Sequence, residues 1–426
     1  MITDLFGTAQ RAVILTLRRE RALSYQFFNR ETMINKKIGL AIIIIVFLVS
    51  ALSSYAFFSK NSGSSLGEAI RSPLSSYKPP QSNGNGNKST ISSEPKTEEC
   101  PINGEMLTKK QKDKWEKRRP LGVMIENHKE ARPQSGLSMA DVVYEAVAEG
   151  GITRFLAVYY CKDASYIGPV RSARIYFIRL LQEYADYPLY AHVGGANTPG
   201  PADALGYIKT IGWGLYNDLN QFAVPFPYFW RDYERLPGRA TEHTVYSSTS
   251  KLWQYAKEKR DLSEVDEDNG VWNKNFIQWK FKDDSQLSDR GTTGKIDFGF
   301  WTSFASEYAV TWNYEKSTNS YKRVNGGSPH LDKNSGKQLA AKNIVILFTR
   351  ESSANDGYPG GHILYKVTGS GEAVVFQDGN AITATWNKID EESRVKFTDD
   401  STGKEIPMVR GQVFIEILPT GNKVNY

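Results

Sequence analysis

The chain has 426 residues, of which 40% are hydrophobic and 12% aromatic, and its formal net charge is +6. This length and composition are typical of a globular protein with room for two domains and a tail. Residues 1–37 carry seven basic and three acidic residues, a net +4, so only +2 is left for everything downstream. A nearly neutral body has no broad electrostatic footprint for a polyanion, which excludes nucleic acid as the expected partner.

An uncharged segment at 38–58 predicts one transmembrane helix. Its 21 residues are long enough to cross a hydrocarbon core of about 30 Å. Lys36 and Lys37 precede it, and this excess of positive charge places residues 1–37 in the cytoplasm and the rest outside. The membrane is therefore an expected partner, through a single span. Two alternatives stay open: a cleaved secretory signal ending near 54–56, and a true start at Met33 that would make 1–32 an artefact or a leader.

A disordered tether is expected at 59–118, because residues 59–99 are rich in Ser, Asn, Gly, Pro and Lys. Such a composition buries too little apolar surface to offset the entropy lost on ordering. The two cysteines of the chain, Cys100 and Cys161, both fall on the outer side. An even number of cysteines in an oxidising compartment predicts a disulfide between the two.

Two domains of different class are expected after the tether, which makes the fold class α+β preceded by one transmembrane helix. In 119–270, strand-like runs at 121–127, 141–148, 152–160 and 189–195 alternate with helical patterns at 172–185 and 202–212, so this domain is mixed α/β. Thr198 and Pro199 are expected to cap the second helix. In 275–426, short strand-like runs are separated by Gly, Asn and Asp turns, and this domain is mainly β.

No strong catalytic or metal-binding motif is present, so neither a metal nor a cofactor is expected. Ser248 and Lys251 fit the S-x-x-K acylation motif, but no companion motif follows. The histidines show no metal-ligand spacing within a helix turn, and a structural role is the simplest interpretation of each. They are His128, His192, His243, His330 and His362.

Arginines are the more informative feature of the first domain. Arg171 and Arg174 flank Ser172 where a helix is expected to begin, although positive charge there opposes the helix dipole. A bound anion or a nearby carboxylate would make that placement favourable. Arg132 and Arg154 are further candidates for an anion site.

The Gly150–Gly151 pair predicts a hairpin with a two-residue turn. In the expected register, Val147 faces Arg154, so Glu145, Glu149 and Arg154 lie on one face of the sheet. Glu145 and Arg154 then form either a structural ion pair or part of a polar pocket with Arg171, Arg174 and His192.

Several blocks of the sequence together resemble the YerB-like lipoprotein family of bacteria. They are ARPQSGL, EGGITR, GPVRSARIYF, AHVGGAN and TEHTVY in the first domain, and YKRVNGGSPHLD and VVFQDGNAITATWNK in the second. The resemblance covers roughly residues 119–420 and implies a two-domain extracytoplasmic protein anchored at its amino terminus. It implies no reaction, because the family is one of unknown function. No cysteine follows the apolar run, so a retained transmembrane helix is expected in place of lipid attachment.

Two functions fit these observations. The first is a non-catalytic envelope protein that binds a protein partner, a cell-wall component or another anionic ligand through Arg132, Arg154, Arg171, Ser172, Arg174 and His192. The second is an envelope-acting hydrolase or transferase that uses Glu126, Glu145 or Glu149 as acid or base, and His192 or His243 as proton shuttle.

Overall fold

The computed structural model describes residues 94–426. The predicted leader, transmembrane segment and first part of the tether therefore lie outside the described residues. Among residues 94–426, no helix is both long and apolar enough to cross a membrane.

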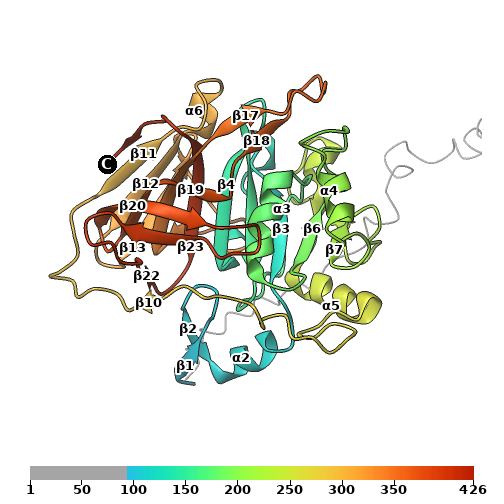
Figure 1. The fold of residues 1–426 in the computed structure, drawn as a ribbon, viewed down its shortest axis with the longest axis horizontal. Helices are drawn as coiled ribbons and strands as arrows, with labels where there is room; N and C mark the ends of the chain where they lie inside the picture. The colour runs from blue at the N-terminus through green and yellow to red at the C-terminus, as the bar shows by residue number, and fades with distance from the viewer. Residues whose placement is uncertain (1–93) are drawn as a thin grey trace, which may run out of the picture. The chain divides into compact units, whose positions relative to one another are not determined.

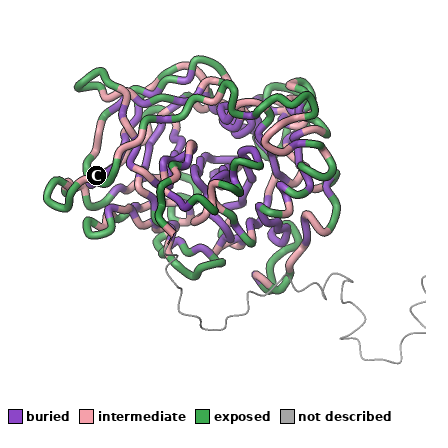
Figure 2. Tube along the Cα trace, turned by 90° about the horizontal axis from the view of Figure 1, so that it is seen from below, coloured by how far each residue is buried: buried purple, intermediate pink, exposed green. Residues whose placement is uncertain are grey.

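A ten-stranded mixed sheet forms the centre of the molecule (Figure 1). In spatial order its strands are β21 (Lys396–Asp399), β20 (Asn380–Lys388), β19 (Gly369–Gln377), β16 (Asn343–Thr349), β23 (Val413–Pro419), β4 (Val142–Glu149), β5 (Ile152–Tyr159), β3 (Leu121–Glu126), β6 (Leu189–His192) and β7 (Asp218–Asn220). The central strands are buried along nearly their whole length, as expected for a sheet covered on both faces (Figure 2).

The sheet takes strands from both predicted domains. β23, from the carboxyl-terminal part, pairs in parallel with β4 on one side and with β16 on the other. Residues 119–270 and 275–426 thus contribute to one hydrogen-bonded sheet, and the domain boundary at 270–275 stays a prediction.

The β4–β5 hairpin has the predicted two-residue turn, with Gly150 and Gly151 at φ 56° and 86°. The predicted register is wrong. Ala146, not Val147, pairs with Arg154, because an irregularity lies between Val147 and Glu149. Such a bulge reverses the face to which the following side chains point, so Glu149 shares a face with Arg154 and Glu145 points to the opposite face.

Five α-helices and four 3₁₀ turns accompany the sheets in residues 94–426. They are α2 (Lys109–Trp115), α3 (Ile175–Leu181), α4 (Ala204–Thr210), α5 (Thr249–Arg260) and α6 (Ala305–Tyr308), with 3₁₀ turns η1 (Lys129–Ala131), η2 (Leu137–Met139), η3 (Gln182–Tyr184) and η4 (Thr241–His243). α3 packs on β3 at Gly122, where an added Cβ would lie 2.7 Å from the Leu181 methyl groups. α4 is capped by Asp203, not by the predicted Thr198–Pro199 pair, because the Asp203 carboxylate accepts from the backbone of Gly206.

A second, smaller sheet confirms that the carboxyl-terminal part is mainly β. Its strands are β14 (Ser328–Pro329), β13 (Ser320–Asn325), β12 (Val310–Glu315), β11 (Lys295–Phe298) and β24 (Val424–Asn425), with β15 (Ala340–Ala341) also paired to β13. It packs on the central sheet through Trp312, whose ring lies 4.9 Å from that of Phe414 on β23. Two-stranded ladders complete the fold: β1 (Lys96–Glu99) with β2 (Met106–Thr108), β8 (Trp230–Arg231) with β9 (Val245–Tyr246), β10 (Phe281–Lys282) with β22 (Met408–Val409), and β17 (Glu351–Ser353) with β18 (Ile363–Tyr365).

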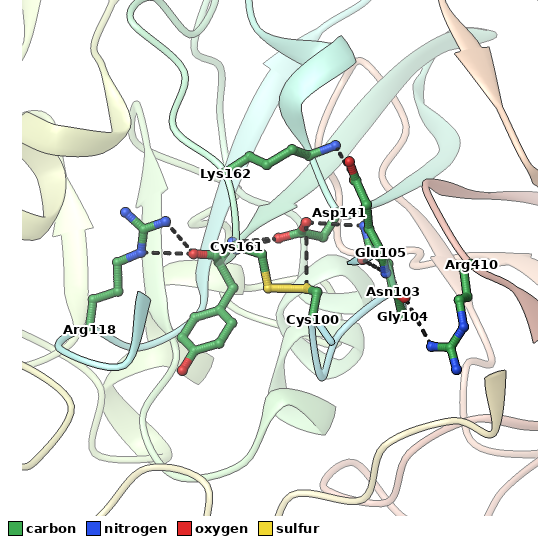
Figure 3. The surroundings of a disulfide bond; sticks show 10 residues. Cys100, Asn103, Gly104, Glu105, Arg118, Asp141, Cys161, Lys162 and Arg410 are labelled. Carbon is green, nitrogen blue, oxygen red and sulfur yellow. Dashed lines mark hydrogen bonds and ion pairs between the residues drawn. A yellow bond between two sulfur atoms is a disulfide. The ribbon is translucent and has the colours of Figure 1, made fainter. Parts of the chain in front are cut away.

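The structure contains the predicted disulfide between Cys100 and Cys161 (Figure 3). Residues 94–118 form β1, β2 and α2, so the prediction of a disordered tether is wrong for this part. Buried Ile102 and Trp115, together with the disulfide, supply the stabilisation that the composition of 59–99 lacks. Asp141 accepts hydrogen bonds from Cys161 N and from the side chain of Asn103, and burial raises its pKa to about 6.

Candidate functional site

A cavity of about 200 Å³, here called the Glu126 cavity, gathers the densest set of predicted site residues. Its walls come from the end of β3, the turn after it, the β4–β5 hairpin, the segment before α3, and η4. The lining residues are Glu126, His128, Ala148, Glu149, Ile152, Arg154, Arg171, Glu242 and His243.

Glu126 is the central carboxylate of this cavity and is only 4% exposed. Its Oε1 lies 3.2 Å from Nε of Arg171, and its Oε2 accepts from Nδ1 of His243 at 2.9 Å. The backbone of Glu126 is fixed on both sides, donating to Pro169 O and accepting from the Gln134 side chain. The end of β3 therefore positions the Glu126 carboxylate to orient both Arg171 and His243.

His243 and His128 form a stacked pair with ring centroids 5.0 Å apart and planes 5° apart. The hydrogen bond to Glu126 raises the pKa of His243, whereas burial and the neighbouring His243 lower the pKa of His128. The charged imidazole of the pair is therefore His243. With Nδ1 donating to Glu126, Nε2 of His243 makes no hydrogen bond to another described residue.

Glu149 forms ion pairs with Arg154 and Arg174. Its Oε2 lies 3.4 Å from Nη2 of Arg154, and its Oε1 pairs with Nη2 of Arg174. Nη1 of Arg154 also donates to the carbonyl of Ser172 at 3.1 Å, so Ser172 contributes its backbone. Burial, with Arg171 next in effect, lowers the pKa of Arg154 to about 10.

Three arginines, Arg154, Arg171 and Arg174, face three carboxylates at this site, those of Glu126, Glu149 and Glu242. The site therefore carries a net positive charge only when His243 is protonated. The side chain of Arg171 is 27% exposed, and its terminal nitrogens make no hydrogen bond to other described residues. They are therefore free to bind a ligand.

Arg171 and Ser172 precede the helix instead of occupying its first turn, because α3 begins at Ile175. Arg174 stands at the N-cap position without a side-chain cap hydrogen bond. The arginines are balanced by carboxylates on neighbouring strands, which removes the unfavourable interaction with a helix dipole that the sequence suggested.

Glu145 lies away from the cavity, in a sealed set of side chains that we call the Arg323 network. Arg323 of β13 pairs with Glu145, and its Nε lies 3.7 Å from Glu416. All three side chains are fully buried. Burial, followed by the charge of Glu145, raises the pKa of Glu416 far above its usual range, so Glu416 is protonated. The other members are His330, Gln134 and Asn127.

Two further predicted residues also lie outside the cavity lining. Both ring nitrogens of His192 are occupied, with Nδ1 donating to Gly194 O at 2.7 Å and Nε2 2.6 Å from Asp218. Arg132 donates to the backbone of Asn127 and of Glu307 and stacks over the ring of Tyr308. Arg132 thus joins the amino-terminal and carboxyl-terminal parts of the fold.

The S-x-x-K match and one grouping with metal-ligand geometry have structural explanations. Ser248 caps α5, its hydroxyl accepting from Lys251 N at 3.3 Å. Among residues 94–426, the one group with metal-ligand geometry is Cys100, Asp141 and Cys161, and its sulfurs are joined in the disulfide. Those sulfurs therefore offer no thiolate to a metal.

Sequence reasoning missed Arg323 and Glu416, and did not connect His128 with His243. A charged residue in an alternating strand pattern was the only available signal for Arg323. The block TEHTVY did carry a signal for the cavity, since it contains both Glu242 and His243.

Comparisons with known proteins agree with this architecture. Residues 107–263 match the amino-terminal domain, and residues 300–415 the carboxyl-terminal domain, of a family described as "Protein of unknown function (DUF3048)". The chain is 32% identical over 311 residues to "Putative lipoprotein YerB" of Bacillus subtilis (strain 168), covering 73% of this chain and 84% of that protein. It is also similar to the crystal structure of the YerB protein from Bacillus subtilis, with a TM-score of 0.61 and 27% identity over 77% of this chain and all of that one. The chain therefore belongs to the DUF3048 family, as the resemblance of its sequence to YerB-like proteins predicted.

Proposed function

We propose that this protein is held at the cell membrane and binds a small anionic ligand of the cell envelope in the Glu126 cavity. The observation that carries the proposal is Arg171, whose side chain is partly exposed in the cavity and whose terminal nitrogens make no hydrogen bond to other described residues. A bound carboxylate or phosphate would accept hydrogen bonds from these nitrogens, and protonated His243 would add to the attraction.

The envelope location is supported by the sequence and by a relative. The apolar segment at 38–58 follows a basic leader, and a protein 32% identical to this one is named as a lipoprotein. In intact spheroplasts of the source cell, added protease is expected to degrade residues 94–426. Protection of this part until the membrane is dissolved would overturn the proposed location.

The ligand site is tested with the full-length chain in a non-ionic detergent and a chloride buffer of low ionic strength. Inorganic phosphate and acetate are titrated separately by calorimetry. Arg171→Ala is expected to weaken binding at least tenfold, and Arg171→Lys less, because lysine keeps the charge but loses the planar donor pair.

Arg350→Ala is the matched control, because Arg350 is exposed and outside the cavity. Equal affinity of the Arg171→Ala and Arg350→Ala variants for both anions would contradict the proposal. Each variant is accepted only if its thermal unfolding midpoint stays near that of the parent chain.

A second function, hydrolysis or group transfer on an envelope polymer, is favoured by the Glu126–His243 pair. Because Nδ1 of His243 donates to Glu126, Nε2 is available for proton transfer, and the arginines could stabilise a developing oxyanion. Incubation with purified cell-wall material tests this function. Soluble products that disappear on His243→Ala but persist on His192→Ala would favour it, and unchanged cell-wall material would count against it.

A further inference from the structure

We propose that a second cavity, which shares no lining residue with the Glu126 cavity and is here called the Tyr187 cavity, binds a carbohydrate. Its volume is about 540 Å³, which falls within the range of roughly 300–1,000 Å³ that is usual for ligand pockets. The lining residues are Gln182, Ala185, Asp186, Tyr187, Ile211, Trp213, Asn275, Ile277, Asp390, Glu392 and Ser393.

The cavity is assembled from three parts of the chain. Tyr187 and Trp213 belong to the amino-terminal part, Asn275 to the segment between the two sheets, and Glu392 to the loop before β21. The cavity therefore exists only when the two halves of the sequence are folded together. Such junctions are common places for ligand sites.

The polar groups of this cavity suit a neutral, hydroxyl-rich ligand. No lysine or arginine is part of the lining, so it differs from the Glu126 cavity and offers no cation to an anion. The carboxylates of Asp186 and Glu392 form no hydrogen bond or ion pair with other described residues. Carboxylates accept hydrogen bonds from hydroxyl groups, and the side-chain amides of Gln182 and Asn275 can both donate and accept.

The aromatic ring of Tyr187 supplies an apolar surface on which a sugar ring can pack. Tyr187 is 38% exposed, and the ring of Tyr216 contacts it edge-on at a centroid distance of 5.0 Å. Trp213 is 5% exposed and lies in the wall. Aromatic rings with a polar tip combine apolar contact and hydrogen bonding, which is the combination that a sugar requires.

An unusual turn presents Asp186 and Tyr187 to this cavity. Ala185 has φ 64° and ψ −149°, and Tyr187 has φ 51°, conformations that residues with a side chain rarely adopt. The turn thus keeps a large aromatic side chain partly exposed despite an unfavourable backbone.

The test uses the full-length chain in a polyoxyethylene detergent, because a sugar-based detergent would compete. The probe is a β-1,4-linked tetramer of N-acetylglucosamine, followed by saturation-transfer NMR and by calorimetry. We expect saturation of the sugar ring protons and at least a tenfold loss of affinity in Tyr187→Ala. Asp186→Asn is expected to weaken binding several-fold, because an amide replaces one acceptor by a donor.

Tyr233→Ala is the matched control, since Tyr233 is 48% exposed and is not in the lining. Retained anion binding at the Glu126 cavity in Tyr187→Ala shows that the variant is folded, so loss of glycan binding alone supports the proposal. Equal glycan affinity of Tyr187→Ala and the parent chain would overturn it. The absence of saturation transfer to the tetramer would also overturn it. Binding of the cation cadaverine that the tetramer does not displace would do the same.

Discussion

The Glu126 cavity and the Arg323 network are built from the same residue types, yet they differ in access to water and in how far the arginine donors are used. In the network, one arginine lies between Glu145 and a protonated Glu416, so the charges cancel inside a fully buried set. In the cavity, Arg171 is partly exposed and its terminal nitrogens make no hydrogen bond to other described residues.

This difference separates a structural polar cluster from a candidate ligand site. A sealed network with every charge compensated stabilises one packing of the two sheets and has no room for a ligand. An accessible arginine whose terminal nitrogens have no hydrogen-bond partner can still bind an added anion.

Arg323→Ala is expected to destabilise the protein by about 3–5 kcal/mol, because it leaves Glu145 buried without its counter-charge. Urea unfolding of the full-length chain measures the change. Adding Glu145→Gln to Arg323→Ala is expected to restore part of the lost stability. A loss under about 1 kcal/mol in the single variant would show that the network is not a sealed structural cluster.

Glu126→Gln is expected to cost only about 1–2 kcal/mol of stability, because water can solvate Arg171. At a pH low enough to keep His243 protonated in the variant, the same change is expected to raise the affinity for phosphate several-fold, since one negative charge is removed. Calorimetry at constant ionic strength measures the affinity. Weaker phosphate binding in Glu126→Gln would count against an anion site governed by net charge.

His243→Gln is expected to change the pH dependence of anion binding. The pKa of His243 is raised above its ordinary value of 6.5, so the imidazolium charge is present below that value and is lost as the pH rises through the raised pKa. Acetate affinity should therefore fall several-fold with rising pH. The variant should show a flatter profile for acetate, whose own charge is constant in this range, and an unchanged profile would exclude His243.

Glu416→Gln is expected to have the smallest effect, under about 1 kcal/mol at pH 4.5, because the amide resembles the protonated carboxyl group. Its pKa is raised in the folded state, so the parent chain is expected to lose stability relative to the variant as the pH rises above 4.5. Urea unfolding at several pH values tests this, and a destabilised variant at pH 7 would contradict a protonated Glu416.

Local patterns predicted the parts of the fold that depend on local interactions. The strands at 121–127 and 189–195 and the Gly150–Gly151 turn follow from alternation and from glycine, and the disulfide follows from compartment and cysteine count. The bulge between Val147 and Glu149 has no comparable signal. Because it reverses the direction of the side chains, it decided that Glu149, and not Glu145, accompanies Arg154.

The site was predicted as a set of residues but not as an arrangement. Glu126 and His243 were both candidates, but 117 positions separate them, and only the tertiary fold brings Nδ1 to the carboxylate. His192 was as plausible as His243 in the sequence. The structure separates them because Asp218 and the Gly194 carbonyl occupy both nitrogens of His192.

Under the proposed anchoring at the amino terminus, the disulfide would have a mechanical consequence. The covalent loop from Cys100 to Cys161 encloses β2, α2, β3, β4 and β5. A pulling force applied upstream of residue 94 would be transmitted through the disulfide bond. The enclosed elements would therefore bear little of this force. In an oxidised molecule under tension, the segments after β5 are therefore expected to extend first, and reduction would add the enclosed residues to the extensible length.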